Sequence, residues 1–452
     1  MANSDITHWR LFVFAAPLIA ASALGFMVPT YLPTLFAADV GLGLSATADT
    51  FRSVSLLEIF VIPFLGLLVD GFQSRRGRRR HWVLVSAVLV AVTTSMLLIA
   101  GPGITTVYLA WWLLASQLAL ALFLVAHLSW GAELSSSYNE QTLVQAWRHV
   151  LEKVGVLSAL AAGVVVSQIR PQGFYLTTAE GIGWPFIVAL LIFVLIAILF
   201  VGERTDRNAD TGGKGVRSTR SSRIGVLIRL LVAAFAIAIA TGVIGSLVPH
   251  VATHVFKLPQ SIGFAYLALL GGGLIFVPLV VGLSYRFGKH RTLTGLAIAN
   301  AIGLPLFYVV PGSSVAMFGV WLGLFGVGLF GGIFLLNSMI ADCAEQLRLE
   351  TGKQRMGLYF ALLLATTKLG LIMAFYATQA FILHLGFTPF QNNSQVALDS
   401  MMHALIGVPL LMYLVAAWVM WNFPTDREQQ GEMRSTLPER SAPVRGDLYT
   451  DS

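Results

Sequence analysis

The stretch GLLVDGFQSRRGRRRHW, from Gly66 to Trp82, decides the fold of this 452-residue chain. An apolar run ends at Asp70, and a cluster of arginines follows between Arg75 and Arg80. Because so many charges are too costly to bury in hydrocarbon, the stretch indicates a membrane helix that stops at a short basic loop, which the positive-inside rule places in the cytoplasm. A weaker copy, GLSYRFGKHR at 282–291, also joins two apolar runs and predicts two related halves.

The composition is typical of a polytopic membrane protein. Hydrophobic residues make up 56% of the chain and charged residues only 11%, whereas about a quarter of the residues in soluble proteins are charged. The net charge of +7 comes from short loops, which favours contact with anionic lipid and argues against a nucleic-acid partner. The single Cys343 allows no intramolecular disulfide.

Twelve apolar runs of roughly 20 or more residues, the length that spans a bilayer, can be drawn along the chain. They cover residues 11–36, 51–69, 82–100, 107–134, 143–169, 183–201, 224–251, 262–285, 292–310, 315–340, 356–385 and 402–421. The runs are continuous rather than alternating, which predicts helices and not a barrel. Because the number of spans is even, both termini are expected in the cytoplasm.

The predicted fold is all-α, with 12 transmembrane helices in two pseudo-symmetric six-helix bundles. We expect the N-terminal bundle at 1–202, a cytoplasmic linker at 203–223 and the C-terminal bundle at 224–423. The polar residues 424–452 are expected to form a disordered cytoplasmic tail.

Two further matches support the repeat. Glu152–Leu157 in the fifth span matches Thr367–Ile372 in the eleventh, and Ala132–Glu133 before the fifth matches Ala341–Asp342 before the eleventh. Parallel repeats of this kind are used by transporters of the major facilitator class, which bind substrate at the membrane midplane between the halves.

Ionisable residues inside the spans are candidate functional residues because burying them in a membrane is expensive. Lys153 and Lys368 lie near the midplane if a helix rises about 1.5 Å per residue. Glu58 lies well inside the second span, where desolvation disfavours a charged carboxylate and favours binding and release of a proton. Arg148 and Glu152 are four residues apart and can neutralise each other.

Each of these candidates has an alternative interpretation. Arg148 and Glu152 can form a purely structural ion pair, and Lys368 can snorkel to the interface. His127 can be a satisfied polar contact rather than part of a relay. Lys368 would also oppose proton binding by Glu58 if the two side chains pair.

The sequence gives no sign of a metal centre or an enzyme. His250 and His254 have ligand spacing, but no acidic residue lies between Asp210 and Asp342 to complete a local site. No HExxH, Walker or GxSxG motif is present. We therefore expect no metal, no cofactor and no catalytic activity.

Three motifs resemble those of the glycoside–pentoside–hexuronide cation symporters, the melibiose-permease branch of the major facilitator superfamily. The first comprises Asp70, Arg75, Gly77, Arg78, Arg79, Arg80 and Trp82. The second comprises Gly131, Ala132, Glu133, Leu134, Tyr138, Glu140, Thr142 and Arg148. The third comprises Ala341, Asp342, Thr351, Gly352, Lys353, Arg355, Gly357, Leu358, Thr367, Lys368, Leu369 and Gly370.

The resemblance implies that Arg148 and Lys368 occupy substrate-site positions and that Glu58 occupies a cation-site position. The full set of candidate substrate-site residues is Lys368, Arg148, Glu152, Ser22, His127 and Lys153. The candidate gating residues are Asp70, Arg75, Arg78, Glu133 and Asp342.

The chain departs from the sugar-transporting members at three of their carboxylates. Ser22 stands at the position of the first-helix aspartate, Ile62 at that of the second cation-site carboxylate, and Leu124 at that of the fourth-helix aspartate. These losses weaken the case for sodium, because a hard cation needs several oxygen ligands. They also favour an anionic substrate over a neutral sugar.

The sequence therefore predicts a secondary transporter that moves a small organic solute by alternating access, coupled to protons. The solute is expected to be a sugar, a sugar acid or another, anionic, molecule. We expect a monomer in the lipid bilayer of a bacterial inner membrane. The alternatives are an uncoupled facilitator, a lysolipid or drug transporter, and a non-transporting scaffold or sensor with the same fold.

Overall fold

The computed structural model describes residues 7–72, 78–135, 137–169, 174–202, 220–258, 262–309, 314–351, 353–388 and 393–424, and their regular structure is helical. The first half contains α1 (His8–Ala15), α2 (Pro17–Thr34), a π-helical turn η1 (Leu35–Asp39), α3 (Leu44–Gly71), α4 (Arg80–Leu98), α5 (Thr106–Leu134), α6 (Tyr138–Ile169) and α7 (Phe174–Phe200). The second half contains α8 (Arg220–His250), the π-helical turn η2 (Val251–Val255), α9 (Ile262–Ile275), α10 (Val277–Phe287), α11 (Lys289–Gly303), the 3-10 turn η4 (Leu304–Tyr308), α12 (Val315–Thr351), α13 (Met356–His384) and α14 (Gln395–Trp421). Most of the expected linker and all but the first residue of the expected tail lie outside the described residues.

The prediction of an all-helical polytopic membrane protein is confirmed. Among the described residues, ten helices are long and apolar enough to cross a membrane, and the bent pair α9–α10 provides an eleventh span. The pair bends by 41°, next to Pro278, which cannot donate a helical hydrogen bond.

The expected span at 292–310 corresponds to α11 and η4 and contains less α-helix than predicted. The α-helical part has only 15 residues and begins earlier, at Lys289. Pro305 follows its end and lacks the backbone N–H that would continue the helix. The chain therefore finishes this segment as a 3-10 turn.

The same helix pairings recur in both halves. In the first half α2 packs against α6 and α7, and in the second half α8 packs against α13 and α14. Likewise α3 packs against α5 as α9 packs against α12, and α4 packs against α7 as α11 packs against α14. These equivalent contacts give the fold its pseudo-symmetry.

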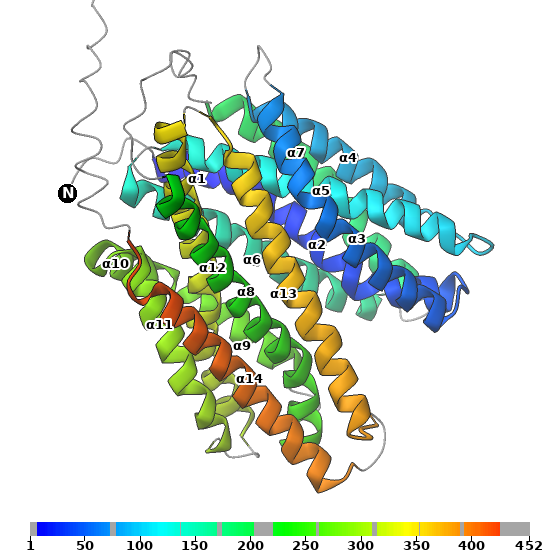
Figure 1. Cartoon of the computed structure of the whole chain (residues 1–452). Coiled ribbons are helices and arrows are strands. Elements are labelled where there is room, and N and C mark those ends of the chain that lie inside the picture. The colour runs from blue at the N-terminus through cyan, green and yellow to red at the C-terminus, as the bar shows by residue number, and fades with distance from the viewer. Residues whose placement is uncertain are drawn as a thin grey trace, which may run out of the picture.

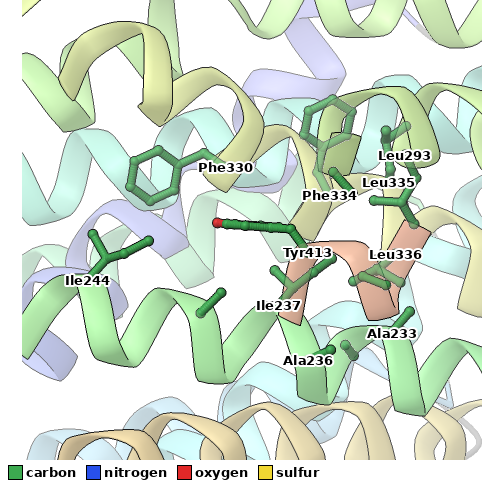
Figure 2. Close-up of a cluster of buried hydrophobic side chains, with 14 of the residues drawn as sticks. Ala233, Ala236, Ile237, Ile244, Leu293, Phe330, Phe334, Leu335, Leu336 and Tyr413 are labelled. Atoms are coloured by element: carbon green, nitrogen blue, oxygen red, sulfur yellow. The ribbon is translucent and has the colours of Figure 1, made fainter. Parts of the chain in front are cut away.

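Two apolar cores form, one mainly in each half. In the second core the buried Tyr413 of α14 points between Phe330 of α12 and Ile244 of α8, with Ile237 and Phe334 nearby (Figure 2). These contacts fix the middle of α12 to the second bundle.

We call the end of the molecule where α3, α5, α10 and α12 finish the basic-loop end, and the other end the opposite end. The two bundles meet at the basic-loop end and diverge from it (Figure 1). In this view the first half, blue to cyan, runs to the right, and the second half, green to red, runs to the bottom. The contacts between the bundles at the basic-loop end therefore determine whether that end is closed or open.

Candidate functional site

The two halves contact each other mainly through three helix pairs, α3 with α13, α6 with α12 and α5 with α13. In the first pair the backbones come closest at Gly66. A Cβ atom added to Gly66 would lie 2.6 Å from the Cβ of Ala361 and 2.7 Å from the carbonyl oxygen of Gly357. Such distances are sterically forbidden, so this closed contact requires a glycine.

Gly66→Ala should therefore open the basic-loop end. Overpacking costs about 1–3 kcal/mol, which would raise the population of the open state about fivefold or more. The measurement is the distance between spin labels on Phe72→Cys and Lys353→Cys, two exposed positions on different halves. Gly295→Ala is the control, because an added Cβ there meets nothing within 4 Å, and equal effects of the two substitutions would contradict the prediction.

Glu58 and Lys368 join the two halves deeper in the same helix pair, about 12 Å from Gly66 along α3. Glu58 is only 1% exposed, and its Oε1 accepts a hydrogen bond from Nζ of Lys368. The Lys368 side chain remains 23% exposed. The structure thus brings together the expected coupling carboxylate and an expected substrate-site lysine. Lys368 binds Glu58 instead of extending to the membrane interface.

Arg148 and His127 form a buried polar group within the first half. His127 Nε2 lies 2.9 Å from the carbonyl oxygen of Phe14 and, as the neutral tautomer, donates to it. This leaves Nδ1 to accept from Nε of Arg148 at 3.1 Å, while Arg148 Nη1 donates to Oε1 of Gln145 at 2.8 Å. His127 therefore has partners at both nitrogens, in agreement with a satisfied polar contact that orients the arginine.

Glu152 pairs with its neighbour Lys153, and the side chains lie 2.8 Å apart. Arg148 donates to His127 and Gln145 instead of forming the expected pair with Glu152. Ser22 Oγ lies 2.7 Å from the backbone oxygen of Glu152 and 2.6 Å from that of Leu18. The serine hydroxyl thus links α2 to α6.

A network of ion pairs holds the basic-loop end of the first half. Arg79 is fully buried and donates to Asp70 Oδ1 at 2.9 Å, to Glu133 Oε1 at 2.9 Å and to the carbonyl oxygen of Val69 at 3.0 Å. Burial alone would lower the pKa of Arg79, but Glu133 and Asp70 together raise it, so the guanidinium stays charged.

Asp70 also connects this network to the second half. Its two carboxylate oxygens accept from the backbone N–H groups of Gly357 and Leu358, at 2.9 and 2.8 Å. Both residues lie in the first turn of α13, where unpaired N–H groups and the helix dipole favour an anion. Arg78 Nη2 contributes a long contact of 3.4 Å to the carbonyl oxygen of Gln354.

The second half has an equivalent ion pair. Lys289, at the start of α11, binds Asp342 on α12 with 2.5 Å between Nζ and Oδ2, just as Arg79 before α4 binds Glu133 on α5. Across the interface, the backbone N–H of Lys289 donates to the Tyr138 hydroxyl, and the Tyr285 hydroxyl donates to the carbonyl oxygen of Asn139. Both pairs therefore lie where the halves are joined.

Several functional candidates were missed in the sequence, and one prediction cannot be placed. Arg75 lies outside the described residues. Arg79 and Lys289 were not singled out as functional candidates. The match of Glu133 with Asp342 and the repeated basic loop could have indicated both of them. His149, a buried histidine between the halves, was also missed because a single histidine in an apolar span carries no motif.

The histidines at the opposite end do not form a metal cluster. Both His250 and His254 contact the ring of Phe387 edge-on. In the portion of the chain that the structure describes, no group of three or more His, Cys, Asp or Glu residues has a geometry suited to a metal ion.

Comparisons with known proteins agree with this architecture. The family model described as MFS/sugar transport protein matches residues 13–427. The chain is 24% identical over 424 residues to the uncharacterized symporter YnaJ of Bacillus subtilis (strain 168), covering 91% of this chain and 89% of YnaJ. It is 23% identical over 429 residues to the raffinose carrier protein of Pediococcus pentosaceus, covering 88% of this chain but only 64% of the carrier.

The fold is also similar to that of solved transporters. A bacterial homologue of the iron transporter ferroportin, in an outward-facing state, superposes with a TM-score of 0.66 and 17% identity. The match covers 92% of this chain and 99% of that one. At this level of identity the likeness shows the fold alone.

Proposed function

Because the chain belongs to the family of MFS/sugar transport proteins, we propose that it is a proton-coupled symporter that moves a small organic acid of the sugar-acid type by alternating access. The observation that carries this proposal is the Glu58–Lys368 pair, which joins the two halves. A proton on Glu58 would remove the charge attraction that holds these residues together. Protonation and movement of the halves would thereby be linked.

The charges of the candidate substrate and coupling residues, taken together, favour an anionic solute. Arg148, Lys153 and Lys368 contribute three cations, whereas Glu58 and Glu152 contribute two carboxylates. Protonation of Glu58 would release Lys368, whose ammonium group could then bind a solute carboxylate. Ser22 is bound to backbone oxygens, and its neutral hydroxyl cannot replace the aspartate that sugar carriers have there.

The contacts at the basic-loop end support a state closed on that side. The positive charges of the loops favour the cytoplasm for this end, so the structure would represent an outward-facing monomer in a bacterial plasma membrane. Transport would require the contacts at Gly66, Asp70 and Lys289 to break while the opposite end closes.

The substrate proposal can be tested with two solutes that differ in one carboxylate, galactose and galacturonate. In proteoliposomes with an acidic exterior, we expect accumulation of galacturonate and little uptake of galactose. Lys368→Gln should abolish the difference. Accumulation of galactose alone would contradict the preference for an acid, and uptake of neither solute would direct the search to a panel of other sugars and organic acids.

A further inference from the structure

His149 is a buried polar side chain with no apparent bonding partner. It is 2% exposed, and neither ring nitrogen has a hydrogen-bond partner among the residues that the structure describes. The other buried histidine of this region, His127, has partners at both nitrogens. An unsatisfied buried polar group destabilises the state that contains it, so the closed state carries a cost at this position.

The surroundings of His149 belong to both halves. His149 lies on α6, and its ring centroid is 5.9 Å from that of Phe330 and 6.0 Å from that of Phe334, both on α12. Nearer the basic-loop end, Thr142 and Ser338 join the same two helices. The imidazole is thus enclosed where α6 and α12 bring the two halves into contact.

The two phenylalanine rings are fixed to the second bundle. Both pack with Ile237 and Tyr413 in the second apolar core (Figure 2). When the bundles separate at the basic-loop end, these rings move away with α12. His149 remains on α6 and becomes exposed to water from that side.

The charged groups near His149 disfavour a positive charge in the closed state. Arg148, Glu152 and Lys153 act on it electrostatically, and all three lie on its own helix. Glu152 is already paired with Lys153, which leaves the charge of Arg148 in excess. From α12 the imidazole meets the phenyl rings of Phe330 and Phe334, which carry no charge that could stabilise an imidazolium.

We propose that His149 is a pH-sensitive switch: the neutral imidazole permits the basic-loop end to close, and the protonated imidazole holds it open. Acidification on that side would therefore favour the open state. This regulation is separate from the proposed coupling through Glu58, and it requires neither a solute nor a proton gradient.

The switch can be tested by measuring the open and closed populations without substrate. Spin labels on Phe72→Cys and Lys353→Cys, in a Cys343→Ser background and in lipid nanodiscs, report the separation at the basic-loop end. An exposed histidine has a pKa of about 6.5, so protonation restricted to the open state raises the open-to-closed ratio about tenfold between pH 8 and pH 5.5. His149→Gln should reduce this response to less than about twofold.

Two further variants make the result decisive. His403→Gln removes an exposed histidine at the opposite end and should keep the full response to pH. His149→Phe places an apolar ring beside Phe330 and Phe334 and should stay closed at both pH values. An unchanged pH response in His149→Gln, or no response in the unmodified chain, would overturn the proposal whether or not the protein proves to be a proton symporter.

Discussion

Glu58→Gln should abolish accumulation of solute while preserving exchange between identical pools on the two sides of the membrane. A difference of one pH unit stores about 1.4 kcal/mol, which supports about tenfold accumulation if one proton accompanies each solute. Glutamine retains the size of the side chain and an oxygen that can accept from Lys368, but it cannot bind or release a proton. The internal-to-external ratio should therefore fall from about ten to about one.

The control for this prediction is a substitution on the same helix. Asp49→Asn removes an exposed carboxylate of α3 that pairs with Arg52, and exposed pairs of this kind contribute about 1 kcal/mol or less. Its accumulation should match that of the unmodified protein. Full accumulation by Glu58→Gln would contradict proton coupling through Glu58, and loss of exchange as well would indicate that Glu58 is needed for solute movement itself.

Arg79→Met should cause the largest loss of stability among the substitutions considered. The guanidinium is fully buried and binds both Asp70 and Glu133. Removing one partner of a buried ion pair costs about 3–5 kcal/mol, because the remaining charges stay uncompensated. The measurement is the thermal unfolding midpoint of the purified protein, compared with that of Arg52→Met, which breaks an exposed pair.

Two further variants separate loss of charge balance from loss of packing. In Arg79→Met/Glu133→Gln one uncompensated carboxylate is removed, so part of the lost stability should return. Arg79→Lys keeps the charge but not the planar fork that binds two carboxylates. Its unfolding midpoint should therefore lie between that of Arg79→Met and that of the unmodified protein. A midpoint for Arg79→Met within a degree of that for Arg52→Met would show that the network does not stabilise the closed state.

The fold could be predicted because each membrane span leaves a continuous apolar run in the sequence. The boundaries were less accurate where polar turns extend a helix beyond the membrane. Thus α3 begins at Leu44 rather than near residue 51, and α8 begins at Arg220 within the expected linker. The proline at position 305 was visible in the sequence, but its effect on the expected ninth span was not inferred.

The candidate site could be predicted only in part, because its pairs form between distant segments. Glu58 and Lys368 were identified separately from the cost of placing charges in a membrane, and only the fold brings them together. The spacing of four residues suggested that Arg148 binds Glu152, but His127 and Gln145 offer better-placed acceptors. His149 became noticeable only when the absence of hydrogen-bond partners among the described residues could be seen.

The most direct test of the account is to measure proton movement caused by the solute. Weakly buffered proteoliposomes without any ion gradient are given galacturonate outside, and a pH electrode follows the external solution. The account predicts that the exterior becomes alkaline as solute enters, with no effect of sodium, and that Glu58→Gln shows no such change. Entry of the solute without a change in pH, or an equal change in Glu58→Gln, would contradict it.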